Sequence, residues 1–431
     1  MRTRMIGVVV ILAGVVLASP RPGKAGPPPD SSVMTLRDAV AIAVAQSDDL
    51  VAVRAAFTRA EAVRRRALSG IVPTLSGQAS YTLNDEEIRS GAGVIVPRDN
   101  GSGALGMSMT IFDGRAIPML LAANDRFEAA RATLDDARTE LRYRVADAYI
   151  SVLAAEALDR VSLRAVSARK SQIAAAKARL DTGLGLSLDV YRATAAFHRA
   201  ERERVGTDAQ VEAARDVLAA LLGRMPPFEH PLERPRLEPV PAPGEARARA
   251  QALMSRQDLE AQALSLRAAE RMRLATWLSF LPSIELSGNM SMGRETFANP
   301  DGVQFQLSLQ LTWLLYDGGT RYAQLQEDTA AIREAEANRR ITERNVVTGV
   351  RTALRTIRTA DAAILSASAE SKAANEAVRS VGAQFQIGRA TGLEVLEGQL
   401  ALEQAEVEFV RAELDALRAR LQLIRILGEL P

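Results

Sequence analysis

Two segments of the chain share the same order of residues. From Val303 to Trp313 apolar and polar side chains alternate, and the segment then reaches Asp317-Gly318. From Leu105 to Phe112 the alternation is the same, and it leads to Asp113-Gly114, 204 positions before Asp317-Gly318. Self-similarity at a fixed spacing indicates an internal duplication, in which one unit cannot bury its faces alone. The repeated unit consists of short strands between very long helices.

The segments between the strands are rich in Ala, Leu, Arg and Glu, which is typical of long helices and coiled coils. From about 117 to 179 proline occurs only at Pro118, and apolar residues recur at intervals of three and four, which predicts a helix of roughly 90 Å. Glycine ends this helix near 183 and ends a second long helix near 388. We therefore predict two long helical hairpins with equivalent tips.

Four segments, at 71–83, 103–113, 283–293 and 303–315, alternate with a period of two and are predicted to be strands. Each has about the length that crosses a bilayer at a tilt. In the last strand one face is wholly apolar and the other carries Gln, Ser and Thr. This pattern is typical of a water-filled transmembrane barrel, although a soluble sheet packed on a core alternates in the same way.

Residues at the strand ends favour the membrane interpretation. Aromatic side chains gather there and fit the interfacial belts of membrane proteins; these candidates are Tyr81, Phe112, Trp277, Phe280, Trp313 and Tyr316. In each half a proline stands at the start of the first strand, and an Asp-Gly pair follows the second strand. At these places a helix must join a strand. The predicted junction residues are Pro73, Asp113, Gly114, Pro282, Asp317 and Gly318.

Four strands cannot close a barrel by themselves, and an open edge in lipid leaves backbone groups unpaired. The chain is therefore predicted to oligomerise through its strands. A dimer would give eight strands and a plugged barrel, and a trimer would give twelve strands with room for a channel.

The N-terminus predicts export. Arg2 and Arg4 precede an apolar run to Ala18, and small residues allow cleavage at Ala18 or Ala25, so 1–25 is predicted to be a signal peptide.

The chain has no cysteine, which excludes disulfides, and its net charge of +2 makes nucleic acid an improbable partner. The predicted order is then a first repeat over 26–223, a Pro-rich linker over 224–245 and a second repeat over 246–431.

No catalytic, cofactor-binding or metal-binding constellation is found in the sequence. The two histidines, His198 and His230, have no second ligand at a suitable spacing, and there is no phosphate-binding glycine loop or nucleophile elbow. We predict a protein that is not an enzyme and needs no cofactor.

In this order of elements the chain resembles the TolC-like outer-membrane efflux proteins. The resemblance rests on Leu36-Arg37-Asp38-Ala39-Val40 near the mature start, the two prolines and two Asp-Gly pairs of the junctions, and the duplicated tips. It implies a homotrimer with an all-α, long coiled-coil helical barrel plus a transmembrane β-barrel, four strands from each protomer making twelve. It also implies an exit duct from the periplasm across the outer membrane, with a periplasmic adaptor and an inner-membrane pump or secretion transporter as partners.

The resemblance suggests roles at the tips. Asp189, Glu394 and Glu397 match acidic residues at the pore entrance, where rings of charge select ions; the alternative is that they only complement a helix dipole. Gly183, Leu184, Gly388 and Arg389 are candidates for the gate or the adaptor-docking surface. Arg389 is displaced by one residue from the position of an Arg that helps close the entrance in some family members.

A different class of function also fits the long helices. The chain could be a periplasmic coiled-coil scaffold or adaptor whose strands form a soluble β-domain. Such a sheet would need neither aromatic belts nor edges that are closed by other subunits.

Overall fold

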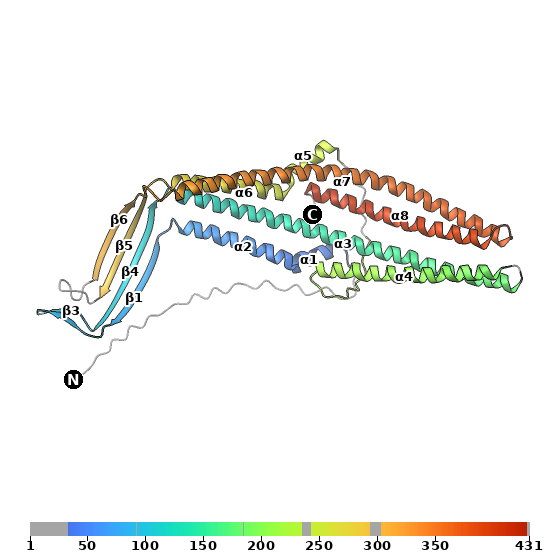
Figure 1. Ribbon diagram of the computed structural model, residues 1–431, viewed down its shortest axis with the longest axis horizontal. Helices are drawn as coiled ribbons and strands as arrows, with labels where there is room; N and C mark the ends of the chain where they lie inside the picture. The colour runs from blue at the N-terminus through green and yellow to red at the C-terminus, as the bar shows by residue number, and fades with distance from the viewer. Residues whose placement is uncertain (1–32, 92, 184, 235–242, 294–302, 429–431) are drawn as a thin grey trace, which may run out of the picture.

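The computed structural model describes residues 33–91, 93–183, 185–234, 243–293 and 303–428. The molecule is elongated, with a sheet at one end, helices running away from it, and two hairpin tips at the far end (Figure 1). The predicted signal peptide, Leu184 and residues 235–242 of the Pro-rich linker lie outside the described residues. The coarse prediction, a mostly helical chain with a small sheet, is confirmed.

Two very long helices run along most of the length of the molecule. Helix α3 runs over Ala116–Asp181 and α7 over Thr320–Gln386, 66 and 67 residues that each correspond to roughly 100 Å. Each turns back at its tip into a shorter helix, α4 (Ser187–Leu221) or α8 (Gly392–Leu427). The two hairpins lie side by side along α3 and α8 (Figure 1).

Four shorter helices lead toward the sheet. They are α1 (Leu36–Gln46), α2 (Asp48–Ser69), α5 (Glu245–Ser255) and α6 (Gln257–Leu278). Thr35 and Asp38 form a capping box at the start of α1. Ser47 (ψ 125°) and Arg256 (ψ 125°) are extended and interrupt the helices. In the second half the extended Arg256 separates α5 from α6, because its ψ lies outside the helical range.

The four main strands make one antiparallel sheet. They are β1 (Thr74–Leu83), β4 (Asp99–Phe112), β5 (Ser283–Gly293) and β6 (Val303–Thr312), in the order β1-β4-β5-β6. The helices adjoining them follow the same order, α2, α3, α6 and α7, each packed on the next. Among the described residues, β1 and β6 therefore each have one edge without a partner strand.

The sheet is exposed on both faces. Every residue of β6 is exposed, and Phe305 and Leu309 keep 71% and 69% of their surface. Hydroxyl pairs cross the other face, with Ser287 and Ser308 oxygens 2.7 Å apart. No element in the described part of the chain covers the apolar face, so the sheet has an unpartnered apolar side and a polar side.

The strand boundaries differ from those predicted. The first strand begins at Thr74 and not at 71, because the Ile71 and Val72 amides still donate to Leu68 and Ser69 carbonyls of the helix end. The last ends at Thr312 and not at 315. The second begins at Asp99, which pairs with Leu83.

A second small sheet lies in the connection between β1 and β4. It consists of β2 (Ile88–Ser90) and β3 (Gly93–Val96), which are antiparallel with an irregular register. Strands of three and four residues are too short to give a clear periodicity.

Each half has its own core. In the first half, Tyr149, Leu141 and Leu218 pack with α1 and with Phe228 of the linker. In the second half, Val346, Val350 and other residues of α7 pack with α5 and α8. Ala146 and Ile150 of α3 meet Leu414 and Leu421 of α8 in a third cluster, which joins the two halves.

Tyr149 ties the linker to this core. Its side chain is fully buried, and its hydroxyl donates to the Glu233 carbonyl oxygen at 2.6 Å and lies 2.8 Å from that of Met34. Burial, partly offset by the bond to Glu233, raises the pKa of Tyr149 to about 12. The hydroxyl thus holds two segments on α3.

We predict that Tyr149→Phe lowers the free energy of unfolding by about 1–2 kcal/mol, because the Glu233 carbonyl loses the donor that the buried hydroxyl supplies. The raised pKa contributes stability below pH ~10 that is lost as the pH rises toward about 12. Denaturation of the detergent-extracted protein at pH 8 and pH 11 measures both effects.

Tyr143→Phe is the matched control, since the Tyr143 ring packs under Arg425 and its hydroxyl makes no hydrogen bond within the described residues. Equal stability of the Tyr149→Phe variant and the parent at pH 8 would contradict the role given to the hydroxyl.

Candidate functional site: the hairpin tips and the membrane-end junctions

Both tips turn on a glycine with a left-handed backbone. Gly183 (φ 74°) follows α3, and Gly388 (φ 75°) follows α7. Their amides donate to the Leu180 and Phe385 carbonyls and close the helix ends. A side chain would be strained at either position, so these two glycines set the sharp reversal of each hairpin.

Glu394 has a structural partner at the second tip. Its carboxylate accepts from the Thr391 amide at 2.6 Å, and its own amide donates to the Thr391 hydroxyl at 3.3 Å. These hydrogen bonds hold the pKa of Glu394 below its ordinary value. The charge is fixed at the start of α8 by a capping box, which is the helix-terminus role considered for it.

The other predicted tip residues have different surroundings. Asp189 is half-buried and lies against Gly392, where a β-carbon would be 3.6 Å from the Asp189 carboxyl carbon. The first tip therefore touches the start of α8. Glu397 and Arg389 are exposed, and in the described part of the chain no hydrogen bond or ion pair reaches either side chain.

Arg179 connects the two tips. Its guanidinium lies 4.2 Å from the Phe385 ring centroid and donates to the Phe385 carbonyl at 3.1 Å. A cavity of 380 Å³ lies beside it, lined by Asp189, Arg192 and Thr391 among others. The tips of one protomer are thus held together by a cation resting on an aromatic ring.

A buried ion pair continues this seam between α3 and α8. Arg169 is 2% exposed and donates to Gln399 at 2.6 Å and to Glu403 at 3.0 Å. Burial raises the pKa of Glu403, and Arg169 partly opposes this rise. One turn or more away, Arg164 pairs with Glu406 at 2.8 Å in an exposed position.

The junctions at the sheet end use aspartate and arginine. Asp113 accepts from Arg115 at 2.9 Å, and hydrogen bonds from Arg115 lower the pKa of Asp113. Gly114 is needed for close approach, because a β-carbon there would lie 2.9 Å from the Leu278 carbonyl oxygen. Pro73, which is exposed, and Pro282 stand immediately before β1 and β5.

The junction between β6 and α7 is held by more hydrogen bonds than the junction between β4 and α3. Arg321 donates to Asp317 at 2.8 Å, to Ser279 at 3.2 Å and to Leu314 at 2.8 Å. Burial alone would raise the pKa of Asp317, but hydrogen bonds from Arg321 and the Gly319 amide outweigh it and lower that pKa. Arg321 therefore joins the start of α7 to the end of α6 and the end of the sheet. Gly318 is left-handed beside it (φ 71°).

Most of the predicted interfacial aromatics meet at this end. Phe280 lies 6.0 Å from Trp277, and its carbonyl accepts from Trp313 at 3.1 Å. Arg321 also sits 4.5 Å from the Phe280 ring. Phe112 and Tyr316 lie at the same end of the sheet, whereas Tyr81 lies toward the opposite end of β1, paired with Gly101.

Sequence reasoning missed the arginines that organise these sites. Arg115 and Arg321 follow the Asp-Gly pairs, two and four positions after the aspartate, so their closeness to these pairs is a signal that could have identified them, although the 204-residue register does not align them. Arg169 and Arg179 carry no such signal, since they look like other arginines of a helix and their partners lie more than 200 positions away.

Metal sites and membrane-crossing helices are both absent from the described residues. No cluster of three or more His, Cys, Asp or Glu residues there could hold a metal ion. None of the helices described is both long and apolar enough to cross a membrane.

Comparisons with known proteins give a consistent result. The profile of the family described as outer membrane efflux protein matches residues 40–224 and 248–429. The outer membrane efflux protein BepC of Brucella suis biovar 1 (strain 1330) is 24% identical over 387 residues, covering 85% of this chain and 84% of BepC.

Solved structures have the same fold. The CmeC outer membrane channel of Campylobacter jejuni superposes with a TM-score of 0.82 at 16% identity, covering 91% of this chain and 85% of CmeC. The outer membrane protein VceC of Vibrio cholerae gives a TM-score of 0.79 at 22% identity, covering 91% of this chain and 96% of VceC.

We predict that Arg169→Met lowers the free energy of unfolding by about 2–3 kcal/mol, because the largely buried Glu403 carboxylate loses its counter-charge. The value lies below that of a fully enclosed pair, since Glu403 remains 19% exposed. Chemical denaturation in detergent measures the change.

Arg164→Met is the control, because Arg164 is 65% exposed and an exposed pair contributes at most about 1 kcal/mol. If both variants lost the same stability, the special role of the buried pair would be refuted.

Proposed function

This chain belongs to the outer membrane efflux protein family, and on that premise we propose that it forms a trimeric exit duct of a tripartite efflux pump or type I secretion system. Family membership confirms the predictions of an outer-membrane transport protein and of a protein that is not an enzyme. The same membership disfavours the periplasmic scaffold with a soluble β-domain.

The free edges of the sheet carry the proposal. Unpaired amides and carbonyls of β1 and β6 cannot face lipid, and four strands are too few to curl into a closed barrel. Three copies that join β6 to the β1 of the next copy would give twelve strands and no edge. The apolar face, with Leu309 and Phe305, would then contact outer-membrane lipid, and the hydroxyl-bearing face would line water.

The helices would continue this barrel into the periplasm. In each copy α2, α3, α6 and α7 stand in the order of the strands, so three copies would form a helical barrel, with the duplicated halves as quasi-equivalent units. Roughly 100 Å of α3 and α7 would carry the tips away from the membrane. There Gly183, Gly388 and Arg389 would meet the periplasmic adaptor of an inner-membrane transporter.

Acidic side chains at the tips would set the ion preference of the entrance. Glu397 is exposed and Asp189 lies where the two tips touch, so three copies would bring six carboxylates around one opening. Glu394 would add a third set of charges, held in place by its capping box. Such rings attract cations by their field. The junction and belt residues would hold the barrel end at the membrane interface.

We predict that Glu397→Gln lowers the cation over anion permeability ratio in planar bilayers by about twofold, since an exposed charge contributes on the order of 0.5 kcal/mol. Glu394→Gln should lower the ratio without loss of stability, because glutamine keeps the capping box. Reversal potentials in a salt gradient measure the ratio.

Glu229→Gln, in the exposed linker far from the tips, is the control and should leave the ratio unchanged. If none of the substitutions at the tip carboxylates changed the permeability ratio, these residues would not line the entrance. Absence of any conductance would count against the duct itself.

A further inference from the structure

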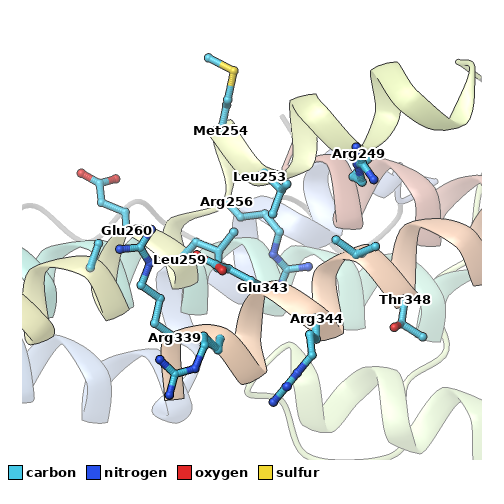
Figure 2. A pocket seen from close by; sticks show the side chains of 13 residues that line it. Arg249, Leu253, Met254, Arg256, Leu259, Glu260, Arg339, Glu343, Arg344 and Thr348 are labelled. Atoms are coloured by element: carbon cyan, nitrogen blue, oxygen red, sulfur yellow. Dashed lines mark hydrogen bonds and ion pairs between the residues drawn. The ribbon is translucent and has the colours of Figure 1, made fainter. Parts of the chain in front are cut away.

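An open groove rich in arginine lies where α5, α6 and α7 meet. It has a volume of 1130 Å³, and Figure 2 shows Arg339 and Arg344 projecting from α7 on the side of the helix away from Met254. Five arginines and two glutamates line it, together with apolar side chains such as Leu259. The lining arginines are Arg249, Arg256, Arg339, Arg340 and Arg344.

The arginines of the groove are only partly neutralised by acidic side chains. Arg339 pairs with Glu343 at 2.9 Å and Arg256 with Asp258 at 2.6 Å, whereas Arg340 approaches Glu336 only to 3.6 Å. Within the described chain Arg344 has no ion pair. An acidic group is therefore the complement that this groove requires.

The equivalent surface of the first half is acidic and already covered. Residues 204 positions before Arg340 and Arg344 are Asp136 and Glu140 of α3. This surface lies against the beginning of α6, in a pocket shared with Arg256 and with Arg425, which contacts Glu140 at 2.5 Å. Within one protomer, the acidic surface of α3 thus meets Arg256, immediately before α6, and Arg425 of α8.

In the first half, α3 packs against the start of α6. The helix start that would pack in the same way against α7 must come from another protomer. Along the row α2, α3, α6 and α7, the outer members are α2 and α7, next to the open edges of β1 and β6. Helix α2 begins with Asp48 and Asp49, at the place where α6 begins with Gln257 and Asp258. Asp48 is exposed and has no ion pair in the described part, and Asp49 stays 71% exposed beside Arg144.

We propose that the arginine groove of α7 receives the acidic start of α2 from a second copy of this chain, with Asp48 and Asp49 against Arg340 and Arg344. This contact rests on the proposed trimer and specifies how its protomers recognise one another. The signs are opposite to those of the contact inside the protomer, where acidic residues of α3 face Arg256 and Arg425.

The reversal gives the assembly a direction. Two α7 surfaces repel each other because both are basic, whereas α7 and a neighbouring α2 attract, so only head-to-tail contacts are favoured. Head-to-tail contacts close into rings when the rotation permits. The attraction between α7 and the neighbouring α2 would thus favour a ring over other assemblies before the strand edges pair.

The absence of cysteine allows a direct test by cross-linking. Asp48→Cys combined with Arg344→Cys, treated with a short bismaleimide in intact cells, should give covalent dimers and trimers on a denaturing gel. Asp208→Cys, on an exposed site of α4, combined with Arg344→Cys should give single chains only. A native trimer without the first cross-link would overturn the proposal while leaving the duct intact; a protein that is never trimeric would overturn both.

Charge exchange tests the electrostatic part. Arg344→Asp should raise the dissociation constant of the trimer on the order of tenfold, and added Asp48→Arg should restore it. Added Asp208→Arg has the same change in net charge and should not restore it. Failure of Asp48→Arg to restore assembly, or no effect of Arg344→Asp, would overturn the pairing.

Discussion

The unpaired edges of a four-stranded sheet constrain everything else in this molecule. Strands β1 and β6 each present a row of backbone donors and acceptors with no partner, next to an apolar face that no described element covers. Neither feature is compatible with an isolated chain in water or in lipid. The long helices, the junctions and the charged groove are understandable as parts that bring several such sheets together in register.

The helix order transmits this constraint along the molecule. Because each strand continues into a helix and the helices keep the strand order, closing the sheet with further copies would also bring α2 of one copy beside α7 of another. Arg321 makes this continuity rigid by holding Asp317, Ser279 and Leu314 around one guanidinium. At the far end Arg169 and Arg179 hold the two hairpins of one copy together, so the two ends use similar chemistry for different purposes.

Much of the architecture could be predicted from local sequence pattern. Alternation over Val303 to Thr312 and the glycines at 183 and 388 carry signals that depend on neighbouring residues only. The break at Arg256 carries no glycine or proline, and the β2-β3 hairpin is too short to show a period. Partners such as Arg169 and Glu403 are 234 positions apart, and only the folded chain shows that they meet. Thr391 and Glu394 form the Thr-x-x-Glu pattern of a capping box, a local signal that the sequence analysis did not use.

Native mass spectrometry of the full chain released from outer membranes in mild detergent tests the central claim most directly. The account predicts a dominant species with three copies of the mature chain, because twelve strands leave no open edge. A dominant single copy, stable in the same detergent with β1 and β6 unpaired, would contradict it.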